Sequence, residues 1–378
     1  MQKNLQIQQC KRWVIKVGSA LVTDNGKGFD FKLINQWAKQ IAKLIESNHE
    51  IILVSSGAIV CGFQRLGKTS RPTLLPELQA CAAIGQMRLA NGYEQIFGKY
   101  GLITAQILLT HEDHADRTRY LNTRATLLEL LKLKTIPIIN ENDTVSTDEI
   151  KFGDNDTLGA LVAHTCAADL LVILTDQNGL YDSDPRKNPD AKLVQNAIAG
   201  DPVLETMAGG AASTLSKGGM ITKILAAKRA AQSRTHTIIA NGKEPDVLLR
   251  IADGENLGTF LSAESNPQNS QNSKKLWILD HLQVAGKLFI DEGAKKALQE
   301  NKSLLPIGVV RLQGNFVRGE LVGIYAESDP EKEIARGLIN YNHSQSQRLL
   351  KQPSNKIAEI LGFIQEPELI NRDNLVVF

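Results

Sequence analysis

The sequence predicts an α/β protein in which a mostly parallel sheet is sandwiched by helices, followed by a small, mainly-β unit. Up to about residue 262, short apolar runs rich in β-branched residues alternate with longer helical patterns. This order is typical of a parallel sheet covered on both faces. A polar segment at residues 263–275 then has no apolar periodicity and is typical of a linker. Short strands, glycines and one modest helix follow it, so we expect a second domain.

The predicted strands of the first domain are continuous apolar runs, as expected of strands buried on both faces. In chain order they are Trp13–Val17, Glu50–Val54, Gly101–Leu108, Thr135–Ile139, Leu170–Leu174 and Thr235–Ala240. The helical patterns between them are Phe31–Ser47, Pro76–Tyr100, Thr123–Leu133, Thr157–Cys166 and Met220–Ser233. Ligands of such sheets gather beyond the carboxyl ends of the strands, so we expect functional residues there.

The composition excludes several classes of protein. The chain has 378 residues, of which 42% are hydrophobic and 22% charged, as in an ordinary globular protein. The formal net charge of +2 creates no strong field for nucleic acid or anionic membranes. No run approaches the ~20 apolar residues of a membrane span, and the N-terminus lacks the apolar core of a secretory signal. The cysteines Cys10, Cys61, Cys81 and Cys166 lie far apart, which disfavours a zinc site or disulfides. We therefore expect a soluble, cytoplasmic protein.

The first strand carries a lysine inside its apolar run. Lys16 is followed by the tight turn Gly18-Ser19-Ala20, whose backbone N–H groups can face a phosphate. A lysine in a strand core loses its hydration unless an anion meets it. Alternatively, its stem packs inside while the ammonium group reaches water. This stretch alone leaves both interpretations open.

The second strand ends at Ser55-Ser56-Gly57-Ala58, where a helical pattern begins. Small residues at a helix start expose backbone N–H groups, which suits a carboxylate or a phosphate. A serine cap and a packing glycine explain the same residues without any ligand. The stretch by itself favours the cap.

Short polar residues are concentrated after the strand Thr135–Ile139. They are Asn140, Asn142 and Asp143, and then the run Asp154-Asn155-Asp156. One of them is enough to cap the following helix, and burying the others without partners is costly. The surplus predicts a ligand-binding loop.

Two further stretches suit a nucleotide. Thr175-Asp176 ends a wholly apolar strand, and Gly218-Gly219 precedes a helix that carries Lys223 one turn inside. Neither a P-loop nor a GxGxxG pattern follows any of the strands, so standard NTPase and dinucleotide sites are disfavoured. Phosphoryl transfer asks mainly for positioning and positive charge. Lysines near glycine turns, with acids between them, fit that requirement.

Six stretches together resemble the amino acid kinase family. They occur in the family's order: Lys16-Val-Gly-Ser, Ser55-Ser-Gly-Ala, Asn140-Glu-Asn-Asp, Gly153-Asp-Asn-Asp, Leu174-Thr-Asp and Gly218-Gly-Met-x-Thr-Lys223. From Trp277 onward the chain is similar to a PUA domain, on Asp291-Glu-Gly-Ala, Ser303-Leu-Leu-Pro and Gly314-Asn-Phe-x-Arg-Gly. The resemblance implies an amino acid kinase domain at 1–262, a linker at 263–275, a PUA domain at 276–363 and a C-terminal tail at 364–378.

Within the family, the chain is most similar to enzymes that use ATP and Mg²⁺ to phosphorylate the γ-carboxylate of L-glutamate, the first step of proline biosynthesis. The resemblance implies catalytic roles for Lys16, Lys223 and Asp156. It implies glutamate contacts at Ser56, Asp143 and Asn155, with Asn140 and Asp154 as helpers. It implies ATP contacts at Lys16, Thr175, Asp176, Lys217, Gly218, Gly219, Met220, Ile221, Thr222 and Lys223. Lys217 departs from the family pattern, which has a small residue there. Mg²⁺ is expected to be carried mainly by ATP, with no metal site on the protein.

The resemblance also implies a homo-oligomer, either a dimer or a tetramer, feedback inhibition by proline, and glutamate 5-phosphate reductase as the downstream partner. Kinases of the same family that act on aspartate, N-acetylglutamate, carbamate or UMP are the alternatives within the enzyme class. An RNA-binding protein is the alternative from another class, because PUA domains in other proteins bind RNA. The C-terminal unit lacks the strongly basic stripe that binding to a phosphate backbone favours, so we expect neither nucleic acid nor membrane as a partner.

Overall fold

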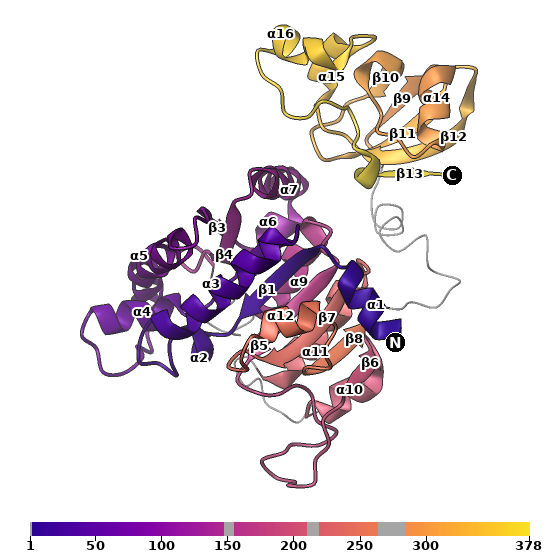
Figure 1. Cartoon of the computed structure of the whole chain (residues 1–378). Coiled ribbons are helices and arrows are strands. Elements are labelled where there is room, and N and C mark those ends of the chain that lie inside the picture. Colours follow the sequence, from indigo (N-terminus) through magenta and orange to yellow (C-terminus); the bar gives the residue numbers. More distant parts are fainter. Residues whose placement is uncertain (1, 147–154, 210–218, 264–283) are drawn as a thin grey trace. The chain divides into compact units, whose positions relative to one another are not determined.

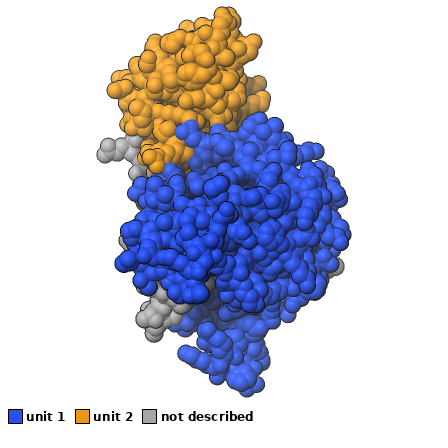
Figure 2. Space-filling model, turned by 90° about the vertical axis from the view of Figure 1, so that its left-hand side faces the viewer, with its two compact units in different colours: residues 1–115, 122–265 blue, residues 116–121, 266–378 orange. Residues whose placement is uncertain are grey.

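The computed structural model describes residues 2–146, 155–209, 219–263 and 284–378. The chain divides into two compact units, residues 1–115 with 122–265 and residues 116–121 with 266–378 (Figure 2). Three of the expected site residues, Asp154, Lys217 and Gly218, lie outside the described residues, as do residues 264–275 of the expected linker. None of the helices in the described part of the chain has the length and apolar character that crossing a membrane requires.

The first unit is built on an eight-stranded sheet with the order β3-β4-β2-β1-β5-β7-β8-β6 (Figure 1). Every pair of neighbouring strands is parallel except β7 and β8, which confirms the predicted mostly parallel sheet. The strands are β1 (Arg12–Val17), β2 (Glu50–Val54), β3 (Thr104–Leu109), β4 (Ile136–Glu141), β5 (Leu170–Thr175), β6 (Asn196–Ile198), β7 (His236–Asn241) and β8 (Thr259–Ser262).

Helices cover both faces of this sheet, because successive side chains of its central strands point to opposite sides and are apolar on both. In β1, Trp13, Ile15 and Val17 pack into one apolar cluster, whereas Val14 packs into another. The first cluster includes residues of α3 (Phe31–Glu46), α4 (Ala58–Arg65), α5 (Leu75–Gly98) and α12 (Val247–Ala252). The second includes residues of α7 (Arg117–Lys132), α9 (Asn155–Thr165), α10 (Pro202–Met207) and α11 (Met220–Ala231). The shorter helices are α1 (Gln2–Gln9), α2 (Ser19–Val22) and α6 (His111–Ala115).

The parallel register brings the strand ends that carry the expected site residues to one edge of the sheet. Lys16 of β1 is paired with Val54 of β2 on one side and with Ile173 of β5 on the other. Ser55 and Thr175, which follow these partners by one and two residues, therefore lie beside the end of β1. Among the boundaries that differ from the sequence prediction, two matter for the site. β4 continues through Asn140 and Glu141, and α9 begins at Asn155, so polar site residues belong to the elements themselves rather than to the loop between them.

The second unit contains a five-stranded sheet with the order β10-β9-β11-β12-β13, which confirms the predicted mainly-β domain. Its strands are β9 (Gly286–Ile290), β10 (Val309–Gly314), β11 (Leu321–Ala326), β12 (Asp329–Leu338) and β13 (Leu375–Val377). Its helices are α14 (Glu292–Gln299), α15 (His343–Leu349) and α16 (Ile357–Leu361), with short 3₁₀ turns at Pro306–Gly308, Ser354–Lys356 and Arg372–Asn374.

Residues 364–378, expected as a tail, are part of this second unit. β13 pairs with β12, and Leu369, Ile370 and Leu375 are buried in the same apolar cluster as the other strands. These apolar residues are too few and too scattered to show a period of their own, so the sequence pattern missed them.

Candidate active site

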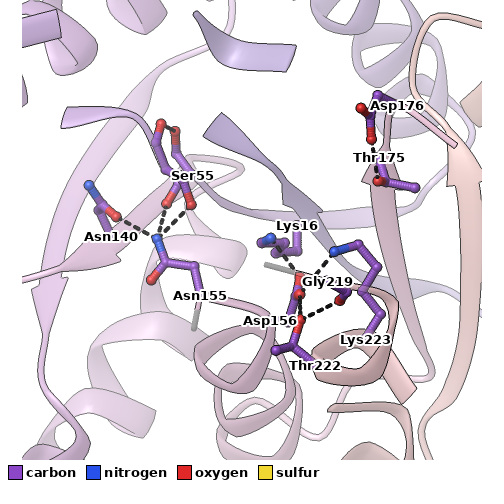
Figure 3. Close-up of polar contacts among 11 residues, drawn as sticks. Lys16, Ser55, Asn140, Asn155, Asp156, Thr175, Asp176, Gly219, Thr222 and Lys223 are labelled. Carbon is purple, nitrogen blue, oxygen red and sulfur yellow. Dashed lines mark hydrogen bonds and ion pairs between the residues drawn. The ribbon is translucent and has the colours of Figure 1, made fainter. Parts of the chain in front are cut away.

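Two lysines and one aspartate form a buried cluster of ion pairs at the carboxyl end of the central strands (Figure 3). Lys16 lies near the end of β1, Lys223 in the first turn of α11, and Asp156 in the first turn of α9. Asp156 Oδ1 is 2.5 Å from Lys16 Nζ, and its Oδ2 is 3.1 Å from Lys223 Nζ. Asp156 is 0% exposed and each lysine 5%. Both ammonium groups contact the same buried carboxylate, so two cations meet at one point of the site.

The ionisation of this cluster follows from its burial and its charges. Burial alone raises the pKa of Asp156, but Lys16 and Lys223, together with hydrogen bonds from Lys16 and Thr222, outweigh burial and hold that pKa well below its ordinary value of 3.8. Burial lowers the pKa of Lys223 below 10.5; Asp156 opposes this shift, and the charge on Lys16 adds to it. The carboxylate therefore stays ionised at neutral pH.

Thr222 completes the contacts of Asp156. Its hydroxyl lies 2.7 Å from Asp156 Oδ2 and 2.7 Å from the carbonyl oxygen of Gly219. Thr222 and Lys223 are neighbours on α11, so the start of that helix holds the aspartate through two successive side chains. Thr222 was expected to contact the nucleotide, and in the structure its hydroxyl faces the carboxylate of Asp156.

A cavity of about 290 Å³ opens beside the ion pairs. Both lysines line it, together with residues 18–21, Ser56, Thr175 and Asp176. The structure therefore brings five expected site residues to one cavity, beside the turn that follows β1. The hydroxyl of Thr175 donates to Asp176 Oδ1 at 3.1 Å. Arg71, in the segment between α4 and α5, also lines this cavity. The sequence interpretation missed it, because one arginine in a polar stretch carries no pattern.

Gly57 shapes the wall of this cavity. It is the residue before α4 and has a positive φ of 103°, a conformation that glycine adopts without strain. A Cβ atom there would lie 2.9 Å from Thr23 Cγ2. Glycine at this position therefore serves both the turn and the close packing. The serine cap that the sequence favoured is wrong, because Gly57 itself is the N-cap residue of α4 and no side-chain cap hydrogen bond is formed there.

A second polar cluster lies next to the cavity (Figure 3). Asn155 Nδ2 is 2.9 Å from the carbonyl oxygen of Ser55, 2.7 Å from Ser56 Oγ and 3.0 Å from Asn140 Oδ1. These residues come from α9, from the end of β2 and from β4, so the amide of Asn155 joins three elements. Asn140, Asn155 and Ser56 are all 5% exposed or less. The structure thus connects three of the expected substrate residues by hydrogen bonds.

Asp143 is 3% exposed and lines another cavity, of about 240 Å³, together with Gln86, Glu141 and Thr144. Gln86 is also a hydrogen-bond partner of Asn140, so this cavity borders the second polar cluster. A third cavity, of about 590 Å³, is lined by residues 179–187, by residues 206–209 and by Gly219, Met220 and Ile221. The sequence interpretation placed Gly219, Met220 and Ile221 in a nucleotide site but missed the first two segments, because turn chemistry explains their Gly, Asp and Pro residues.

Both domains of the chain match the profiles of known protein families. The profile of the amino acid kinase family matches residues 11–241, which include seven of the eight strands of the sheet and every residue of both polar clusters. The chain belongs to the amino acid kinase family. The PUA domain profile matches residues 286–361.

Two relatives in this family are named glutamate 5-kinase. The protein of Azoarcus sp. is 57% identical over 372 residues, with 98% of this chain and 99% of the relative covered. That of Cupriavidus metallidurans is 58% identical over 373 residues, with the same coverage. Among solved structures, the UMP kinase of Bacillus anthracis covers 68% of this chain and 97% of its own length, at 16% identity and a TM-score of 0.46.

Proposed function

We propose that this protein transfers the γ-phosphoryl group of ATP to the γ-carboxylate of L-glutamate, giving L-glutamyl 5-phosphate and ADP at the first step of proline biosynthesis. The observation that carries the proposal is the buried pair of lysines on one aspartate, facing a cavity that Ser56 also lines. Relatives at 57% and 58% identity over almost the whole chain are named glutamate 5-kinase, which supports glutamate as the acceptor rather than aspartate, N-acetylglutamate, carbamate or UMP.

The chemistry needs no general base. A glutamate side chain has an unperturbed pKa of about 4.3 and is already ionised at neutral pH. One carboxylate oxygen forms a bond to the γ-phosphorus, the bond from that phosphorus to the β–γ bridging oxygen breaks, and ADP leaves with the electron pair. No proton is transferred. The main task of the site is to bring two anions together and to stabilise the charge on the phosphoryl group in flight.

Lys16 and Lys223 perform that task. Their ammonium groups lie on opposite oxygens of Asp156, so the carboxylate sets the spacing of the two cations before any substrate binds. A preorganised pair of charges stabilises the transition state without reorganisation at the moment of reaction. Asp156 acts on the reaction through the two lysines and is a positioning residue.

The residues at the cavity fit a nucleotide with its metal. The phosphates occupy the cavity of the two lysines, near the turn at residues 18–21 and Asp176, and the nucleoside occupies the 590 Å³ cavity at Gly219 and Met220. Within the described residues, no group of three His, Cys, Asp or Glu residues is placed to hold a metal ion. We propose that Mg²⁺ enters with ATP; when bound, it would neutralise phosphate charge.

The substrate side is formed by the second polar cluster. Ser56 and the backbone N–H groups after it donate hydrogen bonds to the main-chain carboxylate of glutamate, whereas Asp143 and the amide oxygen of Asn155 attract its ammonium group. The similarity to relatives named glutamate 5-kinase supports three further proposals. These are a homo-oligomer, inhibition by proline, and a glutamate 5-phosphate reductase as the next enzyme. An acyl phosphate is labile in water, which favours a next enzyme that consumes it directly.

The test is ADP release by the purified protein with Mg-ATP and each of five acceptors: glutamate, aspartate, N-acetylglutamate, carbamate and UMP. Hydroxylamine is present to trap an acyl phosphate as a hydroxamate. We expect turnover with glutamate and a trapped γ-glutamyl hydroxamate. Turnover with only one of the other acceptors would show that glutamate is not the substrate. If the folded protein turns over none of the five, the proposal is overturned.

A further inference from the structure

The starting point is an unusually close contact between α4 and α5. A Cβ atom on Gly62 would lie 1.8 Å from the carbonyl oxygen of Cys81, and one on Gly85 would lie 1.8 Å from that of Ala58. Only glycine allows the two backbones to approach this closely. Since α4 begins at the edge of the cavity, this contact brings the next residue of α5, Gln86, to the end of β4.

Gln86 contacts the polar cluster of the site. Asn140 Nδ2 donates to Gln86 Oε1 at 2.8 Å, and Asn140 Oδ1 accepts from the backbone N–H of Glu141 at 2.9 Å. A backbone N–H can only donate, so the amide atom that faces it must be the oxygen of Asn140. The amide nitrogen of Asn140 therefore points to Gln86, and this nitrogen needs an acceptor there.

The orientation of the Asn140 amide also constrains the amide of Asn155. Its Nδ2 faces the carbonyl oxygen of Ser55 and the Oδ1 of Asn140, both of which can only accept. Figure 3 shows this nitrogen between Ser55 and Asn140. The other atom of the amide, Asn155 Oδ1, is buried and has no hydrogen-bond partner among the described residues. A buried acceptor without a partner destabilises the protein, and a ligand that donates a hydrogen bond removes that cost.

We propose that Gln86 is a positioning residue for the acceptor substrate: through Asn140 it holds the amide of Asn155 in the orientation that presents Oδ1 to the substrate's ammonium group. The inference rests on the proposed function, because it takes an amino acid as the acceptor. It adds a residue on α5, outside the cavity of the two lysines, that determines selectivity for an amino group. Without the acceptor at Gln86, the nitrogen of Asn140 is unsatisfied, Asn140 holds the amide of Asn155 less firmly, and a donor binds less well.

The test compares Gln86→Met, which keeps the length of the side chain and removes the acceptor, with the unchanged protein. We expect the KM for glutamate to rise about ten-fold, with kcat and the KM for ATP changed by less than about two-fold. Glutarate has the same carboxylates and no amino group, so its inhibition constant against glutamate should stay within about two-fold. Gln86→Glu retains an acceptor oxygen in either protonation state and should restore the KM for glutamate.

Two controls separate the possible results. Gln95→Met changes an exposed glutamine on the same helix and should leave every constant unchanged. A Gln86→Met protein that melts at a lower temperature with an unchanged KM for glutamate would show a structural role only and overturn the inference. An equal loss for glutamate and glutarate would overturn it as well. If the unchanged protein does not phosphorylate glutamate, the proposed function has failed, and that result is distinct from either of these.

Discussion

Replacing Asp156 with asparagine removes the charge that holds the two lysines and hardly changes the shape of the side chain. Lys16 and Lys223 are each 5% exposed, so the substitution removes the charged carboxylate that both buried ammonium groups contact. Removing one partner of a buried ion pair costs about 3–5 kcal/mol. For a unit of this size, that cost corresponds to a fall in Tm of roughly 6–20 °C. Turnover should fall about 10²-fold or more, because the preorganised charges lose their spacing.

The same substitution changes the dependence of stability on pH. The folded-state pKa of Asp156 lies below 3.8, its ordinary value, so the carboxylate stabilises the fold above that pH. This contribution is lost as the pH falls through the lower folded-state value. We therefore expect the unchanged protein to lose stability in the acid range with a slope that Asp156→Asn lacks. Urea unfolding at a series of acid pH values measures this difference.

The exposed Asp190 provides a matched control, and Asp190→Asn should leave stability and turnover as they are. The reasoning is refuted if Asp156→Asn melts within about 2 °C of the unchanged protein and retains turnover within about three-fold. Such a result would mean that the two lysines do not depend on the carboxylate in solution.

Four further predictions concern other parts of the chain. Lys16→Met should fold and lose about 10²-fold or more in turnover, and near-normal turnover would disprove its role. Gly57→Ala should cost about 1–3 kcal/mol in urea unfolding, because it strains a positive φ; an unchanged midpoint would contradict this. Arg71→Met, at an exposed cation of the cavity, should raise the KM of at least one anionic substrate about ten-fold with an unchanged Tm; unchanged KM values would place Arg71 outside the site. Deleting residues 364–378 removes four buried apolar side chains, roughly 6–12 kcal/mol of burial. It should therefore unfold the second unit in limited proteolysis, and a protected fragment would contradict its place in that core.

The sheet was predictable because its central strands are apolar on both faces. β1, β2 and β5 stand out as continuous hydrophobic runs, and the structure places them within one residue of the prediction. β6 and β8 were missed, because strands of three and four residues are too short to show a period. The ends of β4 and α9 were missed by two residues, since Asn and Asp are typical of loops and only their hydrogen bonds keep them inside the elements.

The candidate site was predictable in its residues but not in its contacts. The stretch around Lys16 left two interpretations open, and what decides between them is Asp156, far away in the chain. Ion pairs over such separations depend on the register of the sheet, which no local pattern contains. Gln86 and Arg71 carried no signal at all, because a glutamine in a helix and an arginine in a polar stretch are ordinary surface residues.

The most direct test of the central claim follows the oxygen atoms of the acceptor. The protein is given Mg-ATP and glutamate with ¹⁸O in both γ-carboxylate positions, with hydroxylamine in the solution, and the released inorganic phosphate is analysed by mass spectrometry. If the carboxylate attacks the γ-phosphorus, one labelled oxygen becomes the bridge of the acyl phosphate. Cleavage at the carbonyl carbon then releases it with the phosphate. We predict one ¹⁸O in each phosphate. Phosphate without the label would mean that water, and not glutamate, is the acceptor at this site, and would contradict the account.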